Sequence, residues 1–304
     1  MKNFIWSLIA AYAVYDILIL ILVWPVDLIK KSTPWSFGSF FCYFFNTFPI
    51  LCNAGAALTL ILMVGDRYRV IVKASNANQS KFRKILIYIT IFMLSLCIAC
   101  PDIIFTTYTT VHNQLMGSST FTAKPIKACF VYLPHQALSK LQPWQIYFLT
   151  LYAILYILPL FIGTYLYYSI YFYLQHHSTS SNLTIEIDVQ RQKKFLNMIF
   201  YLLIIQVICW TPEYIFYVLW YSQYLGQNAA LYRKHLYIYL ICQLFAVRKS
   251  AISPFLFAYF IPEFRKAFFF VFGFCSIRLK CYRNRSPSTD MINLTTTVSK
   301  SSVI

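Results

Sequence analysis

Six long apolar runs, separated by polar stretches, restrict this chain more than any other feature of its sequence. An apolar stretch of about 20 residues is long enough to cross the hydrocarbon core of a bilayer as a helix. Lipid offers no hydrogen bonds to an exposed backbone, so helices are the economical way to span it. Because 59% of the residues are hydrophobic and only 12% are charged, the sequence predicts an all-α membrane protein without a separate soluble domain. The runs lie near residues 4–29, 40–64, 85–107, 144–173, 195–220 and 236–259.

The basic residues are unevenly shared between alternate connections. Seventeen of the 26 Lys and Arg lie at Lys2, within 66–84, within 174–194 and after residue 260. Seven lie in the other connections, around 30–39, 108–143 and 221–235. Cationic loops stay in the cytoplasm, so both ends of the chain are predicted to be cytoplasmic. The net charge of +17 therefore indicates topology and contact with anionic lipid, and not nucleic-acid binding, which would need a soluble basic face.

The nine cysteines show no spacing typical of a zinc or iron–sulfur site. Cys42 and Cys129 both fall on the extracellular side, where disulfides persist, and we expect them to pair. Cys275 and Cys281 follow the last run on the cytoplasmic side, beside basic residues, and are candidates for palmitoylation.

Three ionisable residues, Asp66, Arg67 and Arg69, cluster where the second run ends, and Tyr68 lies among them. Such a cluster can simply mark the water boundary of a helix. The spacing adds weight, because Cys42 lies 25 residues before Arg67. At about 1.5 Å per residue, that helical stretch spans roughly 37 Å, which places the two residues at opposite membrane faces.

Further motifs occur along the chain. Each of them alone has an ordinary packing explanation. They are Asp16 in the first run, Trp35-Ser36-Phe37-Gly38 ahead of Cys42, Pro159 and Tyr167 in the fourth run, Cys209-Trp210-Thr211-Pro212 in the fifth, Ser253-Pro254-Phe255-Leu256-Phe257 in the sixth, and the amphipathic segment 262–268. As an ordered set they resemble the rhodopsin-like (class A) G-protein-coupled receptors over nearly the whole chain.

The resemblance implies a seven-helix receptor bundle at the plasma membrane, of which the six runs are the second to seventh helices. The first helix and the extracellular N-terminus have no counterpart, which we interpret as an incomplete gene model or an alternative start at Met1. We expect residues 1–274 to form the bundle with its short amphipathic helix, and 275–304 to be a disordered cytoplasmic tail. Ser and Thr residues of that tail are candidates for phosphorylation and arrestin binding.

The resemblance also implies a switch at the cytoplasmic face, where a heterotrimeric G protein binds. Asp66 would hold Arg67 at rest, and Arg67 would later swing toward Tyr167. The family's frequent acidic partner is absent from 190–194, which predicts appreciable basal activity.

Two prolines and two aromatic residues complete the implied switch. Pro212 weakens the fifth run's hydrogen-bond ladder and acts as a hinge for Trp210. Pro254 belongs to a motif whose usual Tyr is Phe257 here, so the family's water-bridged link to that Tyr cannot form.

Ligand type is suggested by the pocket half of the bundle. Pro49 stands where aminergic receptors carry Asp, and Val247 where opsins carry the retinal lysine. The long connection 108–143, with alternating stretches at 106–111 and 128–132, could form a hairpin at a wide mouth suited to a peptide. Glu213 provides an intramembrane carboxylate for a cationic ligand group, unless it is a satisfied structural acid. With Trp210 and Tyr217, it forms the predicted ligand-binding set.

Asp16 marks where family members often bind sodium. The positions that match the family's oxygen donors are Ala56, Lys249 and Ser253, so two donors are missing and a cation is present. We therefore predict that Lys249 replaces the ion as the partner of Asp16. The alternative is that Lys249 points elsewhere.

Other classes remain as alternatives. A six-span transporter or channel would be expected to show repeated halves with broken helices, and no internal repeat is evident. A truncated receptor that does not signal is a further alternative. We expect no enzyme activity, cofactor or metal site, because the five histidines lie in connections or at span ends.

Overall fold

In the computed structural model, the described residues are 2–73, 80–111, 126–131, 143–177, 183–224 and 229–271. They contain six helical segments that are long and apolar enough to cross a membrane, as predicted. These segments are Phe4–Lys30, Gly38–Ile71, Lys81–Phe105, Gln145–His176, Val189–Leu219 and Tyr237–Phe260. Many apolar side chains on them are exposed, among them Phe40, Phe161 and Ile104, which is the pattern expected where helices face lipid.

The helices run in chain order as α1 (Lys2–Leu18), α2 (Trp24–Ser32), α3 (Gly38–Ile71), α4 (Lys81–Phe105), α5 (Pro143–Tyr152), α6 (Leu158–His177), α7 (Leu183–Tyr224), α8 (Ala229–Phe260) and α9 (Pro262–Val271). The chain divides into two compact units, residues 1–256 and 257–304.

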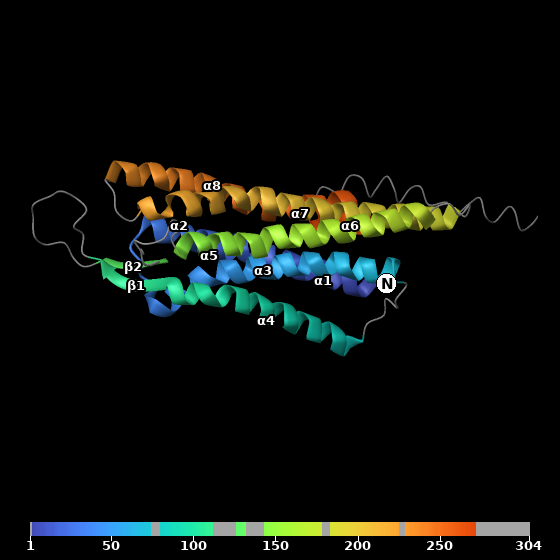
Figure 1. The fold of residues 1–304 in the computed structure, drawn as a ribbon, viewed down its shortest axis with the longest axis horizontal. Helices are drawn as coiled ribbons and strands as arrows, with labels where there is room; N and C mark the ends of the chain where they lie inside the picture. Colours follow the sequence, from blue (N-terminus) through green and yellow to red (C-terminus); the bar gives the residue numbers. More distant parts are fainter. Residues whose placement is uncertain are drawn as a thin grey trace, which may run out of the picture. The chain divides into compact units, whose positions relative to one another are not determined.

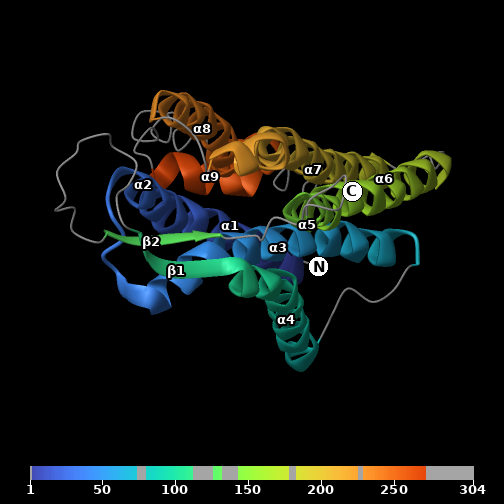
Figure 2. The same cartoon turned by 60° about the vertical axis from the view of Figure 1, so that its left-hand side comes forward.

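Helix α3 lies at the centre of the first unit, where it contacts α1, α4, α6 and α7 (Figures 1 and 2). Its middle is a run of small buried residues, Ala54 to Ala57. Small side chains allow close approach of neighbouring helices in lipid. The Tyr15 ring of α1 packs directly on Gly55, leaving no room for a β-carbon there.

Two of the spans contain a π-helical segment that is followed by a proline. Ile19–Val23 joins α1 to α2 ahead of Pro25, and Ala153–Ile157 joins α5 to α6 ahead of Pro159. Proline has no N–H to donate to the preceding turn. A local shift to the wider π spacing accommodates that missing bond, and such bulges often lie at functional sites.

A two-stranded antiparallel hairpin follows α4. Strand β1 (Thr106–Val111) pairs with β2 (Ile126–Val131), so that Tyr108 lies opposite Cys129. The hairpin expected from the alternating pattern is therefore present, with the second strand at 126–131 instead of 128–132. The disulfide between Cys42 and Cys129 fastens it to the start of α3, as predicted. The backbone N–H of Trp35 also donates to the carbonyl of Lys127, at 3.0 Å.

The second unit contains the end of α8 and the short helix α9. The backbone N–H of Ile261 donates to the carbonyl of Phe257, and the Phe257 and Phe264 rings lie 5.6 Å apart. Glu263 and Arg265 are exposed, so α9 has the amphipathic character expected of 262–268. The predicted tail 275–304, with Cys275 and Cys281, lies outside the described residues.

Candidate functional site

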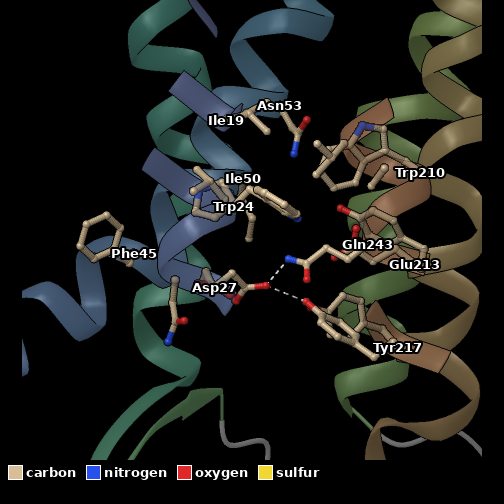
Figure 3. Close-up of a pocket in the computed structure, with 18 of the residues that line it drawn as sticks. Ile19, Trp24, Asp27, Phe45, Ile50, Asn53, Trp210, Glu213, Tyr217 and Gln243 are labelled. Atoms are coloured by element: carbon tan, nitrogen blue, oxygen red, sulfur yellow. Dashed lines mark hydrogen bonds between the residues drawn. The ribbon is translucent and has the colours of Figure 1, made fainter. Parts of the chain in front are cut away.

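A cavity of about 390 Å³ opens between the helices near the hairpin (Figure 3). Its lining is mainly aromatic and aliphatic, with a few polar groups, which is the usual make-up of a ligand site. Ile19, Trp24 and Ile50 form one wall, and Trp210 and Tyr217 form the wall opposite. The lining also includes Cys129, which places the hairpin at the edge of the cavity.

Asp27 on α2 joins the two walls. Its Oδ2 accepts hydrogen bonds from the Tyr239 hydroxyl, at 3.0 Å, and from the side-chain amide of Gln243. Figure 3 shows Asp27 extending across the cavity toward Gln243. The Tyr239 and Tyr217 hydroxyls lie 3.2 Å apart, which extends the network to α7. Asp27 therefore connects α2 with α7 and α8 through one polar network.

The predicted ligand-binding residues share this cavity. Glu213, Trp210 and Tyr217 all line it, and Glu213 and Trp210 are buried. Tyr217 stacks on Phe148 of α5, with ring centroids 4.6 Å apart. The Trp210 and Tyr156 ring centroids lie 6.0 Å apart. Trp210 precedes Pro212, which lies inside α7, by two residues.

A third acid, Asp102, lines the cavity from the last turn of α4. The Tyr147 hydroxyl donates to its Oδ1 at 3.3 Å, and Thr106 donates to its backbone carbonyl at 2.9 Å. Lys30 also lines the cavity, where its ammonium donates to the Asn46 side-chain carbonyl.

At the other end of α3, Asp66 and Arg67 of the predicted charge cluster are buried. The Arg67 guanidinium lies 2.7 Å from Asp66 Oδ2, and Arg69 lies 3.1 Å from Asp66 Oδ1. The guanidinium of Arg67 also lies over the Phe195 ring of α7, at 5.7 Å. Tyr68, between the two arginines, lies beneath the Lys73 ammonium, at 5.9 Å. This end of α3 thus contacts α7 through the Arg67 side chain.

Tyr167 of α6 lies against α7. Its hydroxyl donates to Asn197 Oδ1 at 2.9 Å, and its ring stacks on Phe200 at 4.6 Å. The alternative partner predicted for Arg67 is therefore engaged with α7 in this structure.

The third polar cluster lies between these two ends, within the bundle. Lys249 of α8 donates to Asp16 Oδ1 at 2.7 Å, and Ser250 donates to the same oxygen at 3.1 Å. The Lys249 ammonium lies 4.8 Å from the centre of the Tyr12 ring. Both charged side chains are buried, with Lys249 1% exposed and Asp16 4%. The pairing of Asp16 with Lys249 expected from the sequence is present in the structure.

Comparison with known proteins places this arrangement in a family. The model of the 7 transmembrane receptor (rhodopsin family) matches residues 1–257. The chain belongs to the rhodopsin family of seven-transmembrane receptors.

Curated relatives of this receptor are peptide receptors by name. It is 25% identical over 248 residues to the mouse substance-K receptor, covering 79% of this chain and 59% of that protein. It is 24% identical to the Drosophila tachykinin-like peptides receptor 99D, over 80% of this chain and 46% of that protein. It is 24% identical to the rat neuropeptide FF receptor 2, over 88% of this chain and 64% of that protein. The receptor chain thus spans less than two thirds of the length of these relatives.

Sequence reasoning overlooked several polar residues of the receptor's cavity, namely Asp27, Asp102, Tyr239 and Gln243. A signal was available for the two acids, because the chain has only nine Asp and Glu and these two fall in apolar runs. Intramembrane acids are functional candidates by default. Like Glu213, both acids therefore qualify as candidate ligand-binding residues.

Among the described residues, no group of three or more His, Cys, Asp or Glu side chains could hold a metal ion. The cavity residues can instead offer hydrogen bonds, negative charge and aromatic surface to an organic ligand.

Proposed function

We propose that this chain is a receptor that binds an extracellular peptide and activates a heterotrimeric G protein. One observation carries the proposal: a single central helix, α3, contributes residues to the ligand-sized cavity and to the buried Asp66–Arg67 cluster. Ile50 in the cavity and Arg67 are 17 residues apart on it, which is roughly 26 Å of helix. A rigid element that reaches both sites can couple their occupancy.

Peptide ligands are favoured over small amines. The cavity opens beside the hairpin that Cys42 and Cys129 hold in place, so an extended chain can enter along it. Position 49, on the cavity wall, is proline and offers no carboxylate to an amine. The relatives are named for substance K, tachykinin-like peptides and neuropeptide FF, and these peptides are the first candidates.

Signal transfer would use the residues predicted from the resemblance. A peptide touching Trp210, Tyr217 and Glu213 would shift α7, which carries Pro212 inside the helix. Because the Arg67 guanidinium lies on Phe195 of the same helix, such a shift would change the surroundings of Arg67. The ligand needs only to prefer one of two arrangements for this to act as a switch.

Residues outside the cavity would act at the cytoplasmic side. Pro254 and Phe257 belong to the end of α8 that would rearrange on activation. Arrestin would bind a phosphorylated tail, and palmitoyl groups on Cys275 and Cys281 would anchor that tail to lipid.

The test is G-protein nucleotide exchange in membranes containing the chain, with substance K or neuropeptide FF added. Arg67→Ala is expected to reduce exchange to the level of membranes without receptor, while peptide affinity stays unchanged, because Arg67 lies far from the cavity. Arg69→Ala is the matched control, since Arg69 contacts the same aspartate but is more exposed, at 31%. Full exchange in Arg67→Ala, or the absence of peptide-stimulated exchange in the wild-type chain, would contradict the proposal. Measurable exchange before peptide is added would agree with the predicted basal activity.

A further inference from the structure

Asp102 has an unusual position for a carboxylate in a membrane helix. It is 3% exposed and lines the cavity from the end of α4. Tyr147 donates to one oxygen, Oδ1. The other, Oδ2, is buried and has no hydrogen-bond partner within the described part of the chain.

A structural role accounts for the hydrogen bond at Oδ1 but not for the buried Oδ2. The bond to Tyr147 ties α4 to α5, and the neutral Asn would accept that bond equally well. A buried carboxylate with an oxygen left over is costly, because its charge has lost water without a full replacement. A cation that enters the cavity would remove this cost, since a charged donor to a carboxylate forms the strong type of hydrogen bond.

The other charges of the cavity act in the same direction. Its lining holds three acids, Asp27, Asp102 and Glu213, and one basic residue, Lys30. The ammonium of Lys30 donates to Asn46 and lies 5.7 Å from the Trp35 ring. Acidic residues of the cavity therefore outnumber basic residues by two. In a cavity with apolar walls, such an excess concentrates cations.

The rest of the lining determines what must accompany the charge. Trp24, Phe45, Phe148, Trp210 and Tyr214 all line the cavity. Aromatic walls bury apolar ligand surface and also attract cations through their ring faces. A ligand end that combines one cationic group with an aromatic or aliphatic group matches both features.

We infer that the cavity recognises a basic group, a guanidinium or primary ammonium, beside an apolar residue at the inserted end of the ligand, and that Asp102 Oδ2 is its acceptor. Asp27 and Glu213 add to the negative field. The inference rests on the proposed function as a peptide receptor and specifies the ligand chemistry of its site.

The experiment uses two small probes on the whole chain in lipid nanodiscs. One is Nα-acetyl-arginyl-phenylalaninamide, and the other carries citrulline, a neutral isostere, in place of arginine. Affinity is obtained from the rise in thermal midpoint with probe concentration, because a ligand that binds only the folded state stabilises it. We expect the wild-type chain to bind the arginine probe roughly 10- to 100-fold more tightly than the citrulline probe, the value of a charged hydrogen bond.

Asp102→Asn is expected to remove this preference while leaving citrulline binding unchanged, since Asn keeps an acceptor for Tyr147. Glu263→Gln is the control, because Glu263 is an exposed carboxylate on α9 and does not line the cavity. It should bind both probes like the wild type. The comparison of the two probes needs only the wild-type chain, so the preference for a basic group is tested even if Asp102→Asn fails to fold.

Equal affinity of the wild type for the two probes, or binding of neither, would overturn the inference. So would an unchanged preference in folded Asp102→Asn. Nucleotide exchange tests the proposed receptor function independently of probe binding. If substance K or neuropeptide FF drives exchange equally well in the wild type and Asp102→Asn, the receptor function stands and the role of Asp102 falls.

Discussion

Removal of the Lys249 ammonium offers a direct measure of the buried pair with Asp16. In the variant Lys249→Met, an unbranched apolar side chain replaces most of the lysine stem but not its charge. Asp16 Oδ1 would then keep only the hydrogen bond from Ser250, at 3.1 Å. Its Oδ2 is already buried without a hydrogen-bond partner among the described residues. The substitution therefore leaves a charge in the bundle that is almost uncompensated.

The expected magnitude follows from the burial of both partners. Removing one member of a buried ion pair costs about 3–5 kcal/mol of unfolding free energy, whereas replacing both by uncharged groups is often neutral. The double variant Asp16→Asn with Lys249→Met is thus expected to lie close to the wild type. The coupling in the double-mutant cycle should be about 3 kcal/mol or more. At about 2–4 °C per kcal/mol for a chain of this size class, the single variant should melt roughly 6–20 °C lower.

The assay is thermal unfolding in lipid nanodiscs, followed by tryptophan fluorescence. Lys81→Met, which removes an exposed lysine at the start of α4, is the matched control and should melt like the wild type. The reasoning would be refuted by a Lys249→Met variant as stable as the wild type, or by a double variant that loses the sum of the two single losses. The resemblance predicts that Lys249 takes the place of a sodium ion, so exchange of sodium for potassium is expected to leave peptide affinity unchanged. A sodium-specific loss of affinity would contradict that assignment.

Two further predictions concern covalent and close-packed contacts. Replacing Cys42 or Cys129 by Ala should sharply reduce surface expression, since loss of a native disulfide costs about 2–5 kcal/mol in small domains; surface labelling measures this, and peptide mapping without reductant that finds both thiols free in the wild type would rule out the bond. Gly55→Ala should lower stability by about 1–3 kcal/mol, because a β-carbon there would overlap the Tyr15 ring. Gly65→Ala in the same helix is its control, since nothing lies within 4 Å of its added carbon, and it should be stabilising by about 0.5–1 kcal/mol. Equal melting temperatures for the two glycine variants would disprove the close contact.

Features that depend on short stretches of chain were accessible from the sequence. The six apolar runs match the six described spans because membrane crossing depends on the length and polarity of a continuous segment. The second run predicts a span at 40–64, and the helix continues to Ile71, so the charged cluster is itself helical. The alternation at 106–111 was sufficient to indicate the first strand of the hairpin.

The π-helical segments illustrate a different limit. Pro25 and Pro159 were visible in the sequence, but a proline in a membrane helix can produce a kink, a break or a wider turn. Neighbouring helices decide among these outcomes. The wider turn at Ile19–Val23 bears directly on the cavity, because Ile19 and Val23 line it.

By itself the sequence determined the number of spans, the family motifs and, through the resemblance, the match between Asp16 and Lys249. The tertiary structure alone decided that Asp27 meets Tyr239 and Gln243, which follow it by more than 200 residues, and that Asp102 faces the same cavity as Glu213. Such contacts depend on how each helix is rotated about its own axis. That rotation is set by packing against several neighbours at once, and the spans here are apolar on almost every side, so the pattern within one helix carries little information about which face will meet a partner.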